Sequence, residues 1–488
     1  MEQSYQLVRL LSMFPTSAPF SLTAALMLAG CVHVPDLARP AQLTEAAALA
    51  STASLTAQPG VWPTENWWLG FGDPGLSALI DEALQGSPDL RNAAARVAAA
   101  DAMAEQAGAA LRPSVSLDAS AGLNQQSRSV GFPPQFIPGG LKDTGRIALG
   151  ASFNPDLWGK NRALLAAATS EAEAARVDAA QSRLMLTTAI GAAWAELARL
   201  YGERDSVAAA RQVRQETASL TDRRYRAGIE ARGPLSQAQA RVPATDAELG
   251  GLDEAIAISR HRLAALAGAG PDRGLAIIRP QMVPQGEGLP GDAGIELVAR
   301  RPDLVSARLH AAAAAARIKA ARADFYPNIA LSGFIGGQSL GLGNLFGSTA
   351  RIANGSAAFS LPVFDGGRIA AHYRGASADY EGAVARYDAT LIAALRDVAD
   401  AVTARHMAEA AIANQQRAVD FSADAARAAR ARWLGGLSTQ LPVLIAQDTL
   451  FAHQRVLANL EARRLGLEIA LIRALGGGYR SAPPAKGE

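Results

Sequence analysis

The sequence predicts an α+β membrane protein in which three copies close a 12-stranded β-barrel, four strands per chain, continued by a long α-helical coiled-coil barrel. Three observations predict this class. The chain of 488 residues consists of two similar halves, each half contains two segments of alternating polarity, and each half contains one very long Ala-rich segment. Alternation with period two indicates half-buried strands, whereas long Ala-rich windows favour helix.

Composition excludes several function classes. The formal net charge is +2 and 19% of the residues are charged, so the chain lacks the basic footprint of a nucleic-acid-binding protein. The six histidines form no close pair with metal-ligand spacing, and no phosphate-binding loop or Gly-x-Ser-x-Gly elbow occurs. We therefore expect neither an enzyme nor a metal site nor a bound cofactor.

Residues 1–30 are expected to be a secretory signal. Arg9 precedes a mostly apolar stretch that ends in small residues before Cys31, the only cysteine. Leu28-Ala29-Gly30-Cys31 resembles the bacterial lipobox, which implies a covalent lipid on the sulfur of Cys31. The alternative is an ordinary buried cysteine in an apolar helix. After the signal no run of 18 apolar residues follows, so a mature chain that crosses a bilayer must do so in a closed β-barrel.

The two halves are internal repeats. At an offset of 214, Pro88-Asp89-Leu90 aligns with Pro302-Asp303-Leu304. At an offset of 208, Gly228 aligns with Gly436. An intermediate alignment at 206 pairs three residues, Phe153, Trp158 and Arg162, with Phe359, Phe364 and Arg368. Each half reads helix, strand, loop, strand, long helix, turn, long helix.

These boundaries predict the domain organisation. We expect a lipid-anchored N-terminal segment with an equatorial region at 31–86, a first repeat at 87–285, a second repeat at 286–478 and a C-terminal tail at 479–488.

Two strand pairs are predicted, at 113–125 and 145–154 in the first repeat and at 327–337 and 351–362 in the second. In the first strand, serines and Asp118 alternate with an apolar face made of Val115, Leu117, Ala119, Ala121 and Leu123. Segments of about ten residues with two such faces are typical of tilted membrane strands, with one face to lipid and one to the lumen. Phe334 interrupts the polar face of the third strand. An amphipathic sheet on a soluble core is the alternative.

Long helical hairpins are predicted at 159–268 and 367–475. At about 1.5 Å per residue, the first helix of each hairpin spans on the order of 100 Å. Apolar residues recur at coiled-coil spacing in both, at Ile190, Trp194, Leu197 and Tyr201 and at Leu391, Leu395, Val398 and Val402. Four strands cannot close a barrel, but three copies supply about twelve, with an open lumen. The sequence thus predicts a trimeric conduit.

The chain resembles the TolC-like outer-membrane factors, in particular the lipoprotein branch that serves multidrug and nodulation-type exporters. The resemblance spans essentially the whole mature chain. The motifs that carry it are Trp68-Leu-Gly-Phe71-Gly-Asp73-Pro74, Asp156-Leu-Trp158-Gly159, Tyr225-Arg-Ala-Gly228, Arg301-Pro-Asp303, Ala323-Asp-Phe-Tyr-Pro327, Gly436-Leu-Ser438 and Gly476-Gly-Gly478.

The resemblance implies the outer-membrane channel of a tripartite efflux system. Such a channel is a homotrimer, lipid-anchored in the bacterial outer membrane and extending into the periplasm. It passively conducts small molecules from an inner-membrane pump and a periplasmic adaptor protein to the outside. The family's helical turns form the periplasmic tip where the adaptor docks, and the matching residues here are Arg224, Tyr225, Gly228, Arg432, Trp433 and Gly436.

One position departs from the family pattern. Relatives often place an acidic residue of a gating ring just before the Ala-Gln of the last hairpin, where this chain has Ile445. The departure favours a hydrophobic gate constriction that involves Leu441 and Ile445 over an ion-pair gate.

The alternative function is a lipid-tethered periplasmic coiled-coil adaptor that does not cross the outer membrane. It would share the signal, Cys31 and the helical hairpins, but it would not need two strand pairs with a lipid face.

Overall fold

The computed structural model describes residues 34–37, 41–51, 53–55, 60–127, 129, 133–284, 288–291 and 293–481. The predicted signal and Cys31 lie outside the described residues. The chain forms two compact units. We call the described residues within 1–42, 100–172 and 310–384 the sheet unit, and the described residues within 43–99, 173–309 and 385–488 the helical unit.

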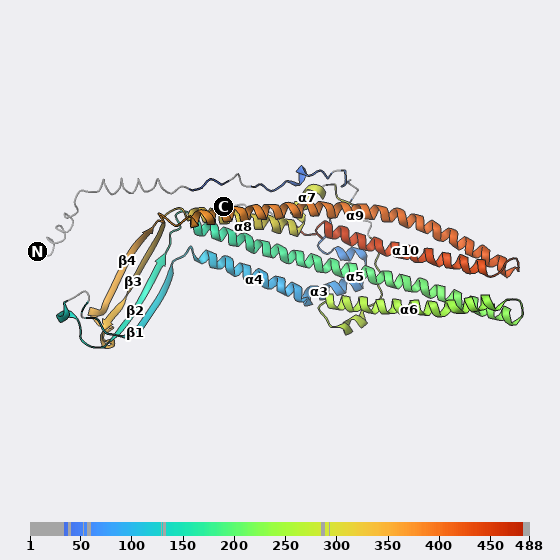
Figure 1. Cartoon of the computed structure of the whole chain (residues 1–488), viewed down its shortest axis with the longest axis horizontal. Coiled ribbons are helices and arrows are strands. Elements are labelled where there is room, and N and C mark those ends of the chain that lie inside the picture. The colour runs from blue at the N-terminus through green and yellow to red at the C-terminus, as the bar shows by residue number, and fades with distance from the viewer. Residues whose placement is uncertain are drawn as a thin grey trace. The chain divides into compact units, whose positions relative to one another are not determined.

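The sheet unit contains one antiparallel four-stranded sheet in the order β1-β2-β3-β4 (Figure 1). Its strands are β1 (Ser114–Asn124), β2 (Lys142–Phe153), β3 (Asn328–Leu340) and β4 (Arg351–Ser360). Each repeat contributes one hairpin, and β2 and β3 join the two hairpins. Within the described chain, β1 and β4 are each paired on one side only.

The strand register gathers the apolar side chains on one face. Leu117 lies opposite Leu149, Leu149 opposite Ile335, and Ile335 opposite Ala353, so one apolar row crosses the whole sheet. These leucines and Ile335 are 49% or more exposed in the single chain. A sheet that leaves such a face uncovered must meet another apolar surface.

The opposite face is polar. Ser114 lies opposite Ser152, Ser152 opposite Ser332, and Ser332 opposite Ser356. The hydroxyls of Ser114 and Ser152 are 2.7 Å apart, and those of Ser332 and Ser356 are 2.8 Å apart. The predicted alternation between an apolar and a polar face is confirmed.

The helices follow the order that the repeats predict. They are α3 (Pro74–Gly86), α4 (Pro88–Ala109), α5 (Lys160–Arg226), α6 (Arg232–Leu266), α7 (Ala293–Arg300), α8 (Pro302–Ala323), α9 (Arg368–Leu434) and α10 (Leu441–Ala474). Three of them begin at a proline, whose missing N–H has no partner to lose in the first turn. None of the helices in the described ranges is long and apolar enough to span a membrane.

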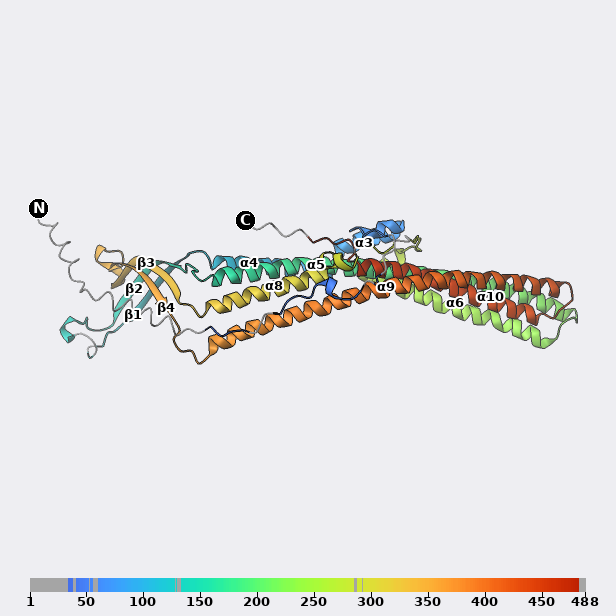
Figure 2. The ribbon, with the colours of Figure 1, turned by 90° about the horizontal axis from the view of Figure 1, so that it is seen from above.

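The helical unit is held by the predicted coiled-coil seams. Ile190, Trp194 and Leu197 are at most 1% exposed in a cluster with α3, and Leu391 and Val398 are fully buried in a second cluster. Each such side chain contributes about 1.5–3 kcal/mol through removal of apolar surface from water. Figure 2 shows α9 and α10 running side by side within this unit.

A buried carboxylate joins the first of these clusters to the start of α3. Asp73 is 3% exposed and accepts hydrogen bonds from the backbone N–H groups of Gly75 and Leu76, which caps α3. Its other oxygen accepts from Trp194 Nε1 at 2.8 Å and from the backbone N–H of Gln281 at 2.7 Å. Asp73 therefore also ties α3 to α5.

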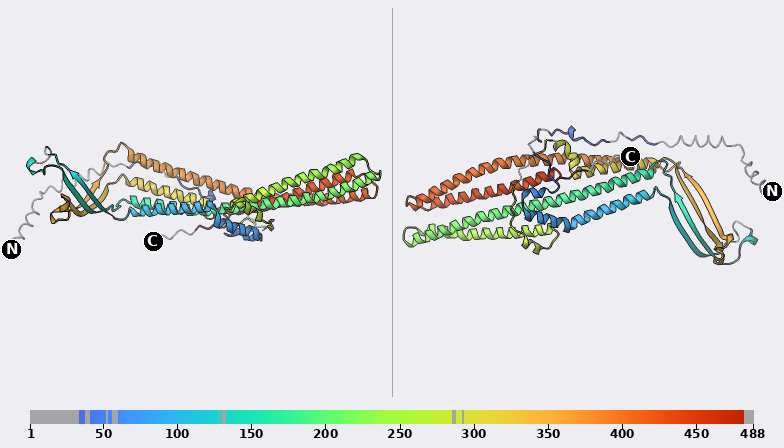
Figure 3. Two further views of the ribbon diagram at one scale, coloured as in Figure 1. Left: turned by 90° about the horizontal axis from the view of Figure 1, so that it is seen from below. Right: turned by 180° about the vertical axis from the view of Figure 1, so that it is seen from behind.

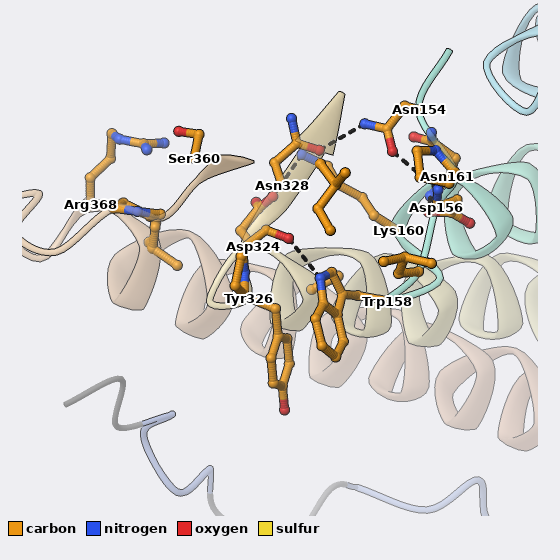
Figure 4. Close-up of a pocket in the computed structure, with 17 residues that line it drawn as sticks. Asn154, Asp156, Trp158, Lys160, Asn161, Asp324, Tyr326, Asn328, Ser360 and Arg368 are labelled. Carbon is orange, nitrogen blue, oxygen red and sulfur yellow. Dashed lines mark hydrogen bonds and ion pairs between the residues drawn. The ribbon is translucent and has the colours of Figure 1, made fainter. Parts of the chain in front are cut away.

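A cavity of about 360 Å³ lies in the sheet unit where the strands give way to helices (Figure 4). Trp158 stacks on Tyr326 with ring centroids 4.9 Å apart, and its Nε1 donates to the backbone oxygen of Pro327 at 2.6 Å. Lys160 forms an ion pair with Asp324 at 2.6 Å. These contacts connect the junction of one repeat to that of the other.

Candidate docking and gating site at the helical turns

Both helical hairpins reverse direction through the same backbone motif. The N–H of Ile229 donates to the oxygen of Arg224 at 2.9 Å, and the N–H of Gly228 donates to Tyr225 at 2.9 Å. These two bonds define a Schellman cap, whose residue after the helix adopts a left-handed conformation. Gly228 accordingly has φ of 70°. The turn after α9 repeats this pattern around Gly436, which has φ of 72°.

The glycines are needed for backbone conformation and not for space. A Cβ atom added at Gly228 or Gly436 would meet nothing within 4 Å. Both turns lie at the same end of the helical unit, as both views of Figure 3 show. This end of the helical unit therefore has two equivalent positions where no described residue lies within 4 Å of an added Cβ.

The two turns contact each other through predicted tip residues. The guanidinium of Arg224 lies 5.4 Å from the ring centroid of Trp433, and Arg224 Nε also lies 3.5 Å from Glu230. Trp433 is 3% exposed, and its Nε1 has no hydrogen-bond partner among the described residues. Trp433 thus holds the two hairpins together, and its ring does not offer a free surface in the single chain. The buried hydrogen bond between Thr221 and Gln440, at 2.6 Å, adds a second link.

The exposed part of the tip is largely apolar. Tyr225 is 41% exposed, Ile229 64%, Leu434 63% and Leu437 75%. Sequence reasoning named Tyr225 but missed Ile229 and Leu437. Their signal was present, because the two residues align at the same offset of 208 as the glycines they follow. Arg432 is also exposed and precedes Trp433 at the end of α9.

The predicted constriction residues lie on one face of α10. Leu441 and Ile445 are one helical turn apart and are 54% and 56% exposed. The next turn carries Asp448, whose carboxylate is bound by Arg214 of α5 at 3.0 Å and by Arg241 of α6. The first carboxylate of α10 is therefore already neutralised within one chain.

Sequence reasoning did not find the cluster around Asp448. Arg214 also donates to Thr245 Oγ1 at 2.6 Å, so side chains of three helices meet here. No local motif signals such a cluster, because its members lie up to 234 positions apart. The candidate site consists of two capped turns that expose apolar side chains and are joined by a cation–π contact. It also includes Leu441 and Ile445 on α10, which are followed on the same helix by the Asp448 cluster. In the described ranges, no group of His, Cys, Asp and Glu residues is arranged to hold a metal ion.

A family model described as outer membrane efflux protein matches residues 79–269 and 295–477. The chain belongs to the outer membrane efflux protein family. The first matched segment begins before the predicted boundary of the first repeat at residue 87, and the second lies within the predicted second repeat at 286–478. The predicted efflux function and outer-membrane location agree with this family.

Individual relatives extend the comparison. The multidrug resistance outer membrane protein MdtP of Escherichia coli O6:H1 is 30% identical over 472 residues, which cover 95% of this chain and 96% of MdtP. The fusaric acid resistance protein FusA of Burkholderia cepacia is 34% identical over 73% of this chain and 68% of its own length. The crystal structure of the outer membrane protein VceC of Vibrio cholerae is 42% identical, with a TM-score of 0.81, and covers 86% of this chain and all of VceC.

These relatives decide between the predicted alternatives. The family model, MdtP and VceC are all named as outer-membrane proteins, which agrees with the predicted fold class and disagrees with an adaptor that never reaches the outer membrane. Their names are those of resistance and membrane proteins and include no enzyme activity.

Proposed function

We propose that three copies of this chain form the passive exit duct of a tripartite efflux assembly. The sheet carries this proposal, because it combines an exposed apolar face with two edges that lack partners in the described chain. In lipid, each unsatisfied backbone group costs several kcal/mol. Threefold symmetry removes that cost when β1 of each copy pairs with β4 of the next, so that the polar faces line a common lumen.

The conducted molecules are small organic compounds. The support is the naming of two relatives for multidrug resistance and fusaric acid resistance. A duct supplies a path and not a reaction, so we propose that energy and substrate choice come from an inner-membrane pump. This chain then acts without catalysis.

A periplasmic adaptor docks on the helical turns in this proposal. The exposed side chains Tyr225, Ile229 and Leu437 offer an apolar contact beside two glycines that leave the backbone accessible. A helix with an apolar face is the partner that suits such a surface. Leu441 and Ile445 of three copies then form the closed constriction, because the adjacent Asp448 is already paired within its own chain.

The closure of the duct is tested by chemical crosslinking of the detergent-solubilised protein. We expect the crosslinked species to stop at three chains, and we expect the same preparation to produce ion currents in a planar lipid bilayer. A membrane-embedded species that stays monomeric or dimeric would contradict the trimer. A trimer without current, even after Leu441→Ala and Ile445→Ala widen the constriction, would contradict the duct.

Lipid attachment at Cys31 is the second part of the proposal. Val34 packs against the sheet-unit cluster that includes Phe325 and Tyr373. Three residues of chain reach at most about 11 Å, so a lipid on Cys31 would be attached close to the sheet unit.

We expect a radiolabelled fatty acid to mark the wild-type protein and not Cys31→Ala. Label that persists in the variant would remove the lipobox interpretation. The variant should remain partly membrane-bound through the sheet, since a single acyl anchor contributes only marginal binding.

A further inference from the structure

The polar face of the sheet carries one aromatic side chain within the described strands, Phe334. Its neighbours across the sheet are Gly150 on β2 and Asn354 on β4. An aromatic ring that lies between a glycine and an asparagine in its own row leaves apolar surface beside polar neighbours. The alternation of the strand does not account for it.

Arg146 of β2 lies over this ring. The guanidinium carbon is 5.0 Å from the centroid of Phe334, although Arg146 itself lies opposite Gln338, two rows away. The row between them consists of Ala148 and Gly336. Ala148 is 2% exposed, and a Cβ at Gly336 would lie 2.1 Å from the oxygen of Ile147. The small row leaves a path along which the arginine side chain can reach the ring.

The guanidinium of Arg146 has no anionic partner in the part of the chain that the structure describes. Within the described residues Arg146 forms neither an ion pair nor a hydrogen bond to an acceptor, and both Arg146 and Phe334 are partly exposed. Asp118 belongs to the same face, opposite Ala148, but it accepts a hydrogen bond from Ser116 at 3.2 Å. A cation–π contact satisfies the flat side of a guanidinium and leaves its N–H edges available.

We propose that Arg146 and Phe334 form a contact site for planar aromatic carboxylates that pass along the polar face. The inference rests on the proposed duct, because it takes this face as the lumen. A carboxylate pairs with the N–H edge of the guanidinium, and the ligand ring stacks beside Phe334 and the guanidinium plane. In a trimer the site occurs three times at one level of the lumen. The contact is weak enough to release the solute, as a conduit requires.

Ligand-observed saturation-transfer NMR on the purified, detergent-solubilised protein tests the site. Benzoate is the probe, cyclohexanecarboxylate is the matched anion without an aromatic ring, and benzylammonium is the matched aromatic cation. In the wild type we expect saturation transfer to benzoate, at least about fivefold weaker binding of cyclohexanecarboxylate, and no binding of benzylammonium. Arg146→Gln and Phe334→Leu should each raise the Kd of benzoate about tenfold, equivalent to about 1.4 kcal/mol.

Lys142→Gln is the matched control, because it removes one positive charge from the same face of the same strand. Its Kd for benzoate should stay within about twofold of the wild type. Each variant is first shown by crosslinking to form the wild-type oligomer, and Arg146→Lys, which keeps the charge but loses the planar fork, should bind benzoate less well than the wild type.

Three outcomes would overturn the inference: no saturation transfer to benzoate in the wild type, an unchanged Kd in Arg146→Gln, or an equal loss in Lys142→Gln. The last outcome would assign the effect to general charge. Failure of the proposed duct would be detected separately, as the absence of an ion current in the planar lipid bilayer. A conducting trimer that shows no selective benzoate contact contradicts only the present inference.

Discussion

At the scale of single residues, the tip glycines separate a structural role from a docking role. Gly436 ends α9 in a Schellman cap with φ of 72°, and an added Cβ would have no atom of the described residues within 4 Å. Any other residue in this conformation costs about 1–2 kcal/mol, whatever its size. The backbone strain is therefore common to Ala and Leu at this position, whereas only the larger side chain blocks a partner that approaches the turn.

We therefore expect Gly436→Ala and Gly436→Leu to lose similar stability but different amounts of efflux. Both variants should form trimers in the outer membrane. Gly436→Leu should lose most of its drug efflux, whereas Gly436→Ala should lose less. Trimer yield and drug accumulation are measured together in cells. Loss of the trimer in Gly436→Leu, or efflux equal to that of the wild type, would remove the docking role of this turn.

Two contacts between single side chains could not be predicted from the sequence. The sequence motif places Trp433 at the tip, but the burial of Trp433 under Arg224 depends on a contact between two hairpins about 200 positions apart. Phe334 was recognised as an interruption of the polar face, and only the fold reveals Arg146 as its partner. Pattern reasoning locates such exceptions, whereas their explanation requires the register.

At the scale of elements, strands and helices could be told apart in the sequence because the periods of their apolar residues are distinct.

The alignment of the two repeats at an offset of 206 was wrong by two residues. Lys160 opens α5 and Arg368 opens α9, which gives 208, and Ser152 and Ser360 hold equivalent places in the two hairpins at the same offset. A slip of two residues keeps every side chain on its face. Polarity alone therefore could not detect the error.

The first turns of the two long helices share an electrostatic device. Asp156 accepts hydrogen bonds from the N–H groups of Asn161 at 2.8 Å and Arg162 at 3.0 Å, and Asp365 accepts from Gly367 and Ile369. Burial alone would raise the pKa of Asp156, but the N–H groups of Asn161 and Arg162 and the Arg162 guanidinium together lower it. For Asp365, the N–H of Ile369 is the main cause of a lowered pKa.

These lowered pKa values predict how the caps respond to acid. A carboxyl whose pKa is lower in the folded state stabilises it fully above the unfolded value of about 3.9, and this stabilisation is lost as pH falls through the folded value. At pH 7, Asp156→Ala should cost about 0.5–2 kcal/mol. The difference in unfolding temperature between wild type and variant should shrink below about pH 4. A difference that stays constant from pH 7 to pH 3 would contradict the charged cap.

At the scale of the whole molecule, most of the architecture followed from the duplication. Two repeats with two strands each, an apolar and a polar face, and two long hairpins were all visible as periodicity and punctuation in the sequence. The contacts that join the repeats were not visible. The pairing of β2 with β3 and the Asp448 cluster depend on which surfaces meet after folding.

The orientation of the sheet in the assembled molecule gives the last prediction. Ala119 lies opposite Ile147 on the apolar face, so Ala119→Arg places a charge in lipid and should cost about 2–4 kcal/mol near the midplane. Ser116 lies on the polar face opposite Gly150, where an arginine meets water and should be tolerated.

Ser120 is a poor control, because it lies opposite Arg146 and a second arginine would add like-charge repulsion. The yield of folded trimer in liposomes, titrated with urea, measures both variants. Equal losses of trimer yield for Ala119→Arg and Ser116→Arg would mean that neither face of the sheet meets lipid. That result would also contradict a barrel closed by three copies.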